Sequence, residues 1–254
     1  MANDSDPGLI LTAALLAGGG LAGYHGGQWL LERGRLRARQ AAHACPEGCA
    51  PVIDAPRPAP PASGALPRRF DAIFEKYRGS IPITYLRALT WRESAMNAGE
   101  RSGPAWGLMQ VVEVVRRDYN RSRGTAFTRE DLLSPEVNVA IATSLLQRII
   151  ASYGKNHPQV PNLQEDWSNR QFVELLTFGW NAGYSEAGGV GRVARFLEAR
   201  GITDITIDVV RENASVAGAS KHLSRRDKVA WCKGVASLYR REWERASQLP
   251  PPAA

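Results

Sequence analysis

The pattern of hydrophobic and polar positions divides the chain into parts of different character. Residues 9–31 are almost entirely apolar, and no charged residue occurs between Asp6 and Glu32. From Phe70 onward, apolar residues instead recur at the three- and four-residue spacing of helices that bury one face. The pattern therefore predicts an apolar N-terminal helix followed by a mainly α-helical globular domain.

Punctuating residues refine this division. Pro82 and Pro135 stand where a first helical turn is expected, a position that tolerates proline because its N–H is not needed there. The stretch Ile202–Ile207 alternates apolar and polar residues, which predicts a short strand. The expected helices span 69–77, 82–91, 113–119, 135–152, 171–180, 190–199 and 224–245. The expected segments are a tail at 1–8, a membrane helix at 9–31, a linker at 32–68, the helical domain at 69–246 and a disordered tail at 247–254.

The apolar stretch 9–31 is long enough to cross a bilayer as a helix, which takes about 20 residues. Asp4 and Asp6 precede it, whereas a cleaved signal peptide begins with positive charge, so a retained anchor in the lipid bilayer is favoured over a signal peptide or a buried helix. Small residues spaced four apart allow two such helices to approach closely, which predicts a homo-oligomer. These small residues are Gly19, Gly23 and Gly27.

The linker between Cys45 and Arg69 is rich in proline and alanine and lacks apolar periodicity. Such chain is a semi-rigid tether, and twenty residues of it extend roughly 60 Å. Cys45 and Cys49 lie at its start and form either a small disulfide in an oxidising compartment or two unpaired thiols. Cys232 falls on the apolar face of the last expected helix, where a buried structural role is expected.

The positive net charge of the chain indicates which classes of binding partner are expected. The chain has 32 lysines and arginines against 25 acids, a net charge of +7, which favours nucleic acid, anionic lipid or an acidic glycan-peptide wall. Neither interleaved basic and aromatic residues nor zinc-finger spacing is present, so no nucleic acid partner is expected. No set of cysteines and histidines has metal-ligand spacing, and we expect neither a metal nor a cofactor.

Glu93 is the strongest candidate for chemistry. It ends an apolar helix in the run Trp91–Asn97 and is followed by the glycine-opened apolar turn Trp106–Val111. Burial raises the pKa of a lone carboxylic acid, and an acid that stays protonated near neutral pH can protonate a glycosidic oxygen. Two later segments accompany it: the Ser-Pro helix start Leu132–Ala142, and Leu175–Gly183, an apolar helix that ends in an aromatic, an amide and small residues.

The order of these motifs resembles the catalytic domain of the soluble-type lytic transglycosylases, relatives of goose-type lysozyme, over Phe70–Tyr239. The matching motifs are Glu93-Ser94, Ser102, Gly107-Leu108-Met109-Gln110, Asn138 in Pro-x-x-Asn, and Asn181-Ala182-Gly183. The resemblance implies a lysozyme-like helical fold. The sequence departs from the family pattern at three places. Trp180 replaces the family tyrosine and removes a hydroxyl, and the turn that contains Pro104 and Trp106 is shorter than usual. The segment Gly154–Arg170 is expected to be an inserted loop in which His157 is exposed.

The resemblance implies cleavage of the β-1,4 bond between N-acetylmuramic acid and N-acetylglucosamine in peptidoglycan, with Glu93 as the catalytic acid. Ordinary glycosidases use two carboxylates. No second acid stands at a position that matches the family pattern. The nearby acids Glu113, Asp118 and Asp131 are expected to solvate the surface or to cap helices. The family route is then intramolecular and gives a 1,6-anhydro product. The expected substrate-binding residues are Ser94, Ser102, Trp106, Met109, Gln110, Trp180, Asn181 and Tyr184.

Other functions remain open at this point. One is a goose-lysozyme-like hydrolase with the same acid, another is a non-catalytic wall-binding assembly protein, and a third is a lipid or nucleic-acid binder that uses the arginines after the anchor. Those arginines, Arg33, Arg35, Arg37 and Arg39, would keep the domain in the cytoplasm by the positive-inside tendency. A wall-cutting domain must face the periplasm, so either this tendency fails or a virion membrane or a secretion machine carries the protein, which would open the wall locally for a phage or an envelope machine.

Overall fold

The computed structural model describes residues 64–248. The predicted anchor, its glycine stripe, the arginines that follow it and both linker cysteines lie outside the described residues. Within 64–248, none of the helices combines the length and the hydropathy that a membrane crossing needs.

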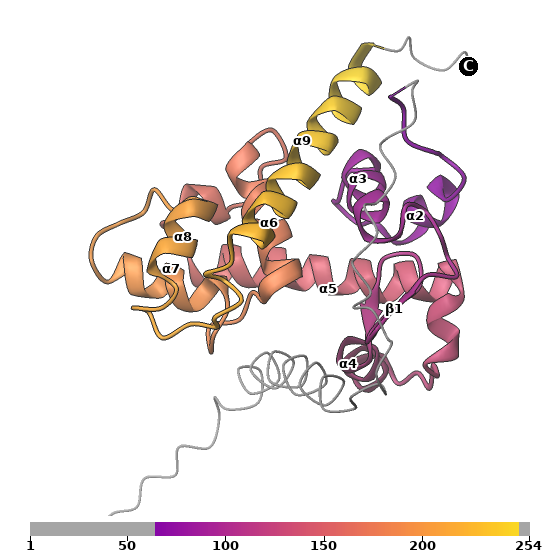
Figure 1. The fold of residues 1–254 in the computed structure, drawn as a ribbon, viewed down its shortest axis with the longest axis horizontal. Coiled ribbons are helices and arrows are strands. Elements are labelled where there is room, and N and C mark those ends of the chain that lie inside the picture. Colours follow the sequence, from indigo (N-terminus) through magenta and orange to yellow (C-terminus); the bar gives the residue numbers. More distant parts are fainter. Residues whose placement is uncertain (1–63, 249–254) are drawn as a thin grey trace, which may run out of the picture.

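The described chain is mainly helical (Figure 1). Its helices are α2 (Asp71–Tyr77), α3 (Ile83–Ser94), α4 (Glu113–Arg123), α5 (Pro135–Asn156), α6 (Arg170–Ala182), α7 (Val190–Glu198), α8 (Ile207–Asn213) and α9 (Arg226–Gln248). Short 3₁₀ turns occupy Glu130–Leu133 and Pro161–Leu163, and the strands are β1 (Arg101–Ser102), β2 (Ala105–Trp106) and β3 (Val111–Val112).

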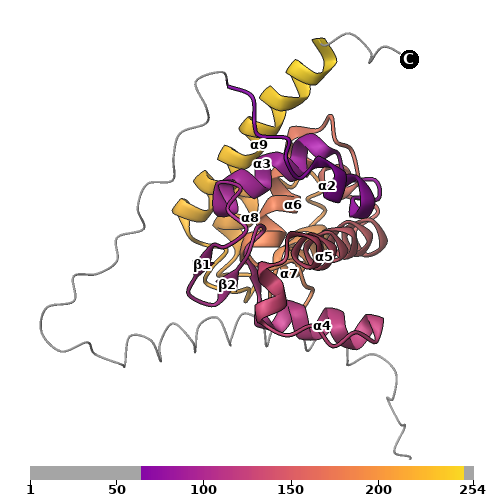
Figure 2. The same ribbon diagram turned by 90° about the vertical axis from the view of Figure 1, so that its right-hand side faces the viewer.

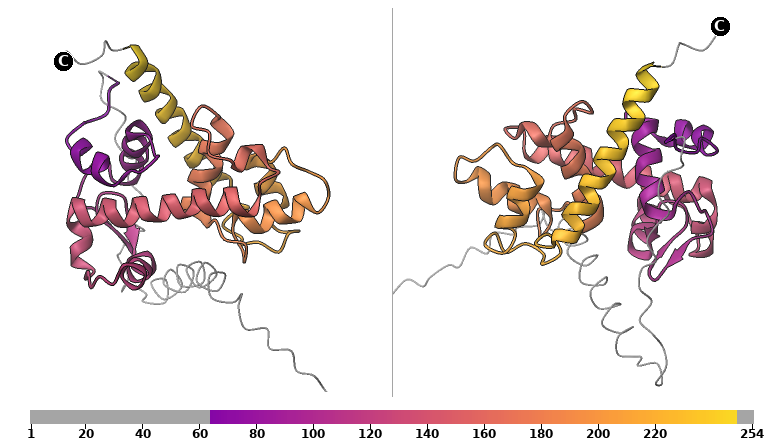
Figure 3. Two further views of the ribbon diagram at one scale, coloured as in Figure 1. Left: turned by 180° about the vertical axis from the view of Figure 1, so that it is seen from behind. Right: turned by 45° about the horizontal axis from the view of Figure 1, so that its top comes forward.

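Helix α6 lies at the centre of the domain. Every residue from Phe172 to Trp180 is buried, as expected for a helix that is covered on all sides. Helix α9 packs along both α3 and α6, and α5 runs from the part that holds α2, α4 and the strands to the part that holds α7 and α8 (Figures 1 and 3). The ends of α3 and α6 are thereby held in one core.

The strands form a three-stranded antiparallel sheet in the order β1-β2-β3 (Figure 2). Arg101 pairs with Trp106, and Trp106 pairs in turn with Val111. The apolar pattern predicted helices at α2 to α7 and at α9, but it predicted neither α8 nor this sheet. Each strand has only two residues and shows no alternation. The sheet matters because it carries the turn that faces the end of α3.

The strand predicted at Ile202–Ile207 is wrong. Residues 202–206 belong to no helix or strand, and Ile207 begins α8. Ile205 and Ile207 are fully buried, which explains the alternation, but the side chain of Thr206 accepts a hydrogen bond from the Val209 N–H and starts a helix instead.

The segment Gly154–Arg170 is not a loose insertion. Helix α5 continues to Asn156, and Val160 and Leu163 are fully buried. The expectation that His157 is exposed is wrong, because its side chain is only 1% exposed. Glu198 and Glu186 bind its two ring nitrogens, at 2.5 Å (Nδ1) and 2.8 Å (Nε2), and these partners lie too far along the chain for a local pattern to indicate them.

Candidate active site

Glu93 lies in the last turn of α3, and its carboxyl group reaches the end of α6. The indole Nε1 of Trp180 donates a hydrogen bond to Glu93 Oε1 at 2.7 Å. Glu93 is half-buried, and Trp180 is 7% exposed. The sequence suggested that replacing the family tyrosine removes a donor from the acid. The structure shows instead that the indole N–H supplies one.

The backbone has an unusual conformation directly after Glu93 and in the Gly107–Gln110 turn. Among the described residues, left-handed φ values at non-glycine positions occur only at Ala95 (52°), Met96 (65°) and Gln110 (52°). Each such residue costs about 1–3 kcal/mol and persists only where the surroundings enforce it. Here the Asn97 N–H donates to the Ser94 carbonyl at 3.0 Å, and the Arg69 guanidinium binds the Met96 carbonyl. The chain therefore reverses directly after the acid.

Ser94 connects the acid to the Gly-Leu-Met-Gln turn. Its hydroxyl donates to the Leu108 carbonyl at 2.6 Å, and the side chain is buried. The Gln110 side-chain amide donates to the Gly107 carbonyl at 2.8 Å within the same turn. Both residues were expected to bind substrate. In the structure the Ser94 hydroxyl and the Gln110 side-chain nitrogen bind the backbone of this turn.

Asn138 fixes that turn from α5. Its Oδ1 accepts from the Met109 N–H at 2.7 Å, and its Nδ2 donates to the carbonyls of Trp106 and Leu132 at 2.9 and 2.8 Å. Asn138 is fully buried, so these bonds replace lost water contacts. Gly107 is required here, because a Cβ at its φ of +80° would lie 1.9 Å from the Leu132 carbonyl oxygen.

Asn181 contacts a lysine that sequence reasoning did not single out. The Lys228 ammonium group, in the first turn of α9, donates to the Asn181 carbonyl at 3.2 Å and also binds its side-chain oxygen. Burial raises the pKa of the Cys232 thiol, one turn further along α9. A lysine at a helix start resembles an ordinary surface residue in sequence, which is why only the structure reveals it.

The remaining predicted contact residues differ in exposure. Met109 is fully buried and contributes to the core, whereas Ser102 is exposed on β1. Trp106 is half-buried, and the guanidinium groups of Arg101 and Arg129 lie 4.6 and 4.1 Å from its ring centroid. Tyr184 follows α6, and burial raises the pKa of its half-buried phenol.

The acids near the site in sequence have structural partners. Glu113 binds Arg116 and Arg117, and the Arg116 bond lowers its pKa despite partial burial. Asp131 accepts from the Thr128 N–H at 2.7 Å, and Asp118 pairs with Arg148. These contacts fit the surface and capping roles expected for the three acids. Within residues 64–248, no three His, Cys, Asp or Glu side chains gather as a metal site requires.

The described residues thus form a mainly helical domain in which a half-buried acid lies between the ends of two core helices. Residues 72–187 match the model of the transglycosylase SLT domain family, which confirms the resemblance found in the sequence. The match to the SLT domain thus covers a little under half of the chain and includes Glu93, Asn138 and Trp180.

Three solved structures are similar to a larger part of the chain. The 70 kDa soluble lytic transglycosylase of Escherichia coli is 24% identical over 69% of this chain and 25% of its own, with a TM-score of 0.48. Its complex with bulgecin A is 24% identical over 70% of this chain and 25% of its own, with a TM-score of 0.46. An inactive mutant of lytic transglycosylase Slt from Pseudomonas aeruginosa is 20% identical over 73% and 26%, with a TM-score of 0.48. The chain therefore spans about a quarter of the length of these proteins. No curated protein matches it.

Proposed function

We propose that this protein is a peptidoglycan lytic transglycosylase, a lyase that cuts the bond between N-acetylmuramic acid and N-acetylglucosamine and leaves 1,6-anhydro ends. The observation that carries the proposal is the hydrogen bond between Trp180 and Glu93, which fixes one oxygen of a half-buried acid within an SLT domain. The solved relatives are several times longer, so the activity of this chain rests on its own residues and on the shared domain.

In the proposed mechanism the two carboxyl oxygens of Glu93 have different roles. An indole N–H can only donate, so in the acid form Oε1 accepts from Trp180 and the proton belongs on Oε2. Glu93 protonates the glycosidic oxygen as the bond to the muramic anomeric carbon breaks and positive charge develops there. The resulting carboxylate then takes the proton of the muramic 6-hydroxyl, whose oxygen closes on the anomeric carbon. One group thus serves as acid and then as base, and no water is consumed.

Ser94, Asn138 and Gln110 support this chemistry by fixing the backbone around the acid, because their side chains bind the turn that faces it. Ser102, Asn181 and Tyr184 are proposed to contact the glycan strand. Ser102 is exposed on β1, Asn181 is partly exposed in the last turn of α6, and Tyr184 is partly exposed just after that helix. Trp106, which is half-buried, is proposed to contact the glycan strand as well, whereas the fully buried Met109 is proposed to support the turn from the core.

The expected location follows from the segments before the domain. We propose that residues 9–31 anchor the protein in a membrane and that the Pro- and Ala-rich linker lets the domain reach the wall from there. We propose that the domain faces the periplasm and opens the wall locally for a phage particle or an envelope machine. Protease protection of the full-length protein in spheroplasts tests this orientation, since a domain cleaved only after lysis of the inner membrane would contradict it.

Glu93→Gln in the full chain tests the chemistry. The variant should keep the thermal unfolding midpoint of the wild type and lose turnover on purified sacculi, because the amide cannot donate an acidic proton. Mass spectrometry of muropeptides from the wild type should show ends one water lighter than reducing ends. Reducing ends would favour the hydrolase, and binding without any release would favour the non-catalytic scaffold.

A further inference from the structure

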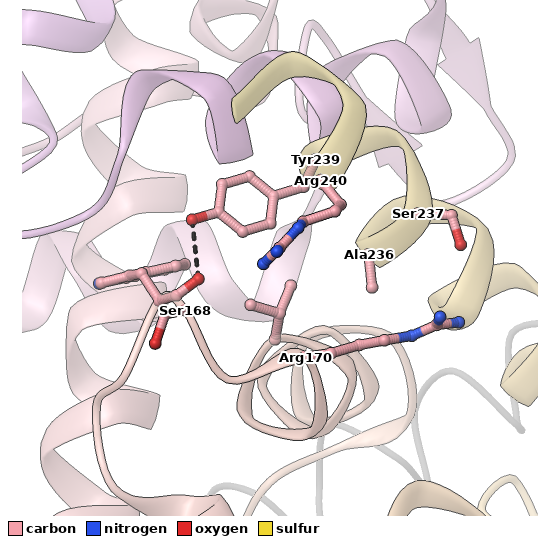
Figure 4. Close-up of a pocket in the computed structure, with 8 residues that line it drawn as sticks. Ser168, Arg170, Ala236, Ser237, Tyr239 and Arg240 are labelled. Atoms are coloured by element: carbon pink, nitrogen blue, oxygen red, sulfur yellow. Dashed lines mark hydrogen bonds between the residues drawn. The ribbon is translucent and has the colours of Figure 1, made fainter. Parts of the chain in front are cut away.

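A pocket separate from Glu93 lies between the start of α6 and the middle of α9 (Figure 4). Its volume is about 420 Å³, within the usual range for small-ligand sites. It is lined by Trp167, Ser168, Arg170, Val173, Ala236, Ser237, Tyr239 and Arg240. Arg170 and Trp180 are ten residues apart in α6, which places the pocket roughly 15 Å along the helix from the acid.

The walls of the pocket are preformed. The Tyr239 hydroxyl donates to the Trp167 carbonyl at 3.0 Å, and the two rings lie 6.2 Å apart at 71°. Trp167 also packs edge-on against Phe172, with centroids 5.3 Å apart. Val173 and Ala236 are buried and supply a small apolar floor. A ligand would therefore meet rigid aromatic walls and little conformational cost.

The charged residues in the lining are both arginines. Arg170 Nε donates to Glu174 at 2.8 Å and Arg240 Nε to Glu244 at 2.9 Å, each one helical turn away. Within residues 64–248 these are the hydrogen bonds that the two guanidinium groups make, so their terminal nitrogens remain available. In Figure 4 the Arg240 guanidinium extends below the Tyr239 ring, while Arg170 extends toward Ser237. Terminal guanidinium nitrogens bind carboxylates in a bidentate manner.

We propose that this pocket binds the carboxylate-bearing peptide side chains of peptidoglycan while the glycan strand occupies the Glu93 site. Peptidoglycan peptides combine free carboxylates with small methyl side chains, which match the arginines and the Val173 and Ala236 floor. Four extended residues span about 13–14 Å, comparable to the distance along α6. The inference rests on the proposed function for the identity of its ligand.

The test measures binding of the free peptide L-Ala-γ-D-Glu-L-Lys-D-Ala to the full-length protein by titration calorimetry. Arg240→Gln should weaken binding by about tenfold or more, because a charge-assisted bidentate contact is lost. Arg241→Gln is the matched control, since it removes the same charge from the next, exposed position of α9 outside the lining and should leave binding unchanged. Amidation of the peptide carboxylates should weaken binding to the same extent as Arg240→Gln.

Three results would overturn the proposal: equal affinities for the two arginine variants, undiminished binding of the amidated peptide, or competition by inorganic phosphate at the concentration of the peptide. The peptide contains no glycosidic bond, so its binding is independent of turnover. Anhydro products from sacculi together with no peptide binding would remove the second site and leave the proposed activity intact, whereas peptide binding without turnover would do the reverse.

Discussion

The bond between Trp180 and Glu93 can be tested by replacing the indole with side chains that differ in one donor. Trp180→Phe removes the N–H from Glu93 Oε1, and Trp180→Tyr removes the indole but restores a hydroxyl donor. The structure predicts that the Phe variant loses turnover on purified sacculi and that the Tyr variant keeps most of it, because the acid needs a donor on one oxygen to direct its proton from the other.

The size of the effect follows from the contact. A hydrogen bond of 2.7 Å to a carboxyl group that becomes charged during the reaction is worth about 1.5–3 kcal/mol. If that energy is gained mainly after proton transfer, its loss slows turnover about 10- to 100-fold. Trp180 is 7% exposed, so both variants also leave space in the core and should unfold at similar, lower temperatures.

The comparison of the two variants separates chemistry from packing. Phe and Tyr have nearly the same volume, so a difference in turnover at equal stability reports the donor alone. The measurement is the initial rate of muropeptide release, with circular dichroism melting curves for both proteins. If Trp180→Phe released muropeptides as fast as Trp180→Tyr while both were folded, the role given to the indole N–H would be refuted.

Two further predictions concern stability. Asn138→Ala should lower the free energy of unfolding by at least about 2 kcal/mol, because it leaves buried backbone groups of the catalytic turn without partners, and urea denaturation monitored by tryptophan fluorescence measures the loss. Burial lowers the pKa of His157, but the hydrogen bonds to Glu186 and Glu198 outweigh burial and raise that pKa above 6.5. Burial raises the pKa of Glu186, but His157 and Arg195 outweigh burial and hold that pKa below 4.5. Stability should therefore fall as pH rises through the raised His157 pKa and as pH drops through the lowered Glu186 pKa. His157→Gln should flatten the melting-temperature profile on the alkaline side of the ordinary histidine pKa of about 6.5, and an unchanged profile would contradict the assignment.

Most helices could be predicted because they follow from the local spacing of apolar residues, and the acid could be predicted from the order of motifs along the chain. Apolar spacing defined α5 and α9, and the Ser-Pro start placed α5 at Pro135. Glu93 was found from the order of four motifs. The contacts around it were not predictable in the same way, since Asn138 and Ser94 matched the family pattern without indicating that both hold the backbone.

The errors share one physical cause. His157 was judged by its place in a polar segment, but residues 29 and 41 positions further along the chain provide the carboxylates that bury it. The sheet depends on pairing between strands of two residues, which leave no periodicity. Lys228 and the pocket at Arg240 likewise depend on where α9 packs, a property of the tertiary structure and not of any single segment.

The packing of α9 also determines where the working unit ends. The family model stops at residue 187, yet Lys228, Cys232 and Tyr239 fill the side of α3 and α6 from beyond that point. A fragment trimmed to the matched segment would expose the flank of its central helix to water. The minimal folded unit for expression and crystallisation should therefore extend through Gln248, and the last helix should be counted as part of the domain.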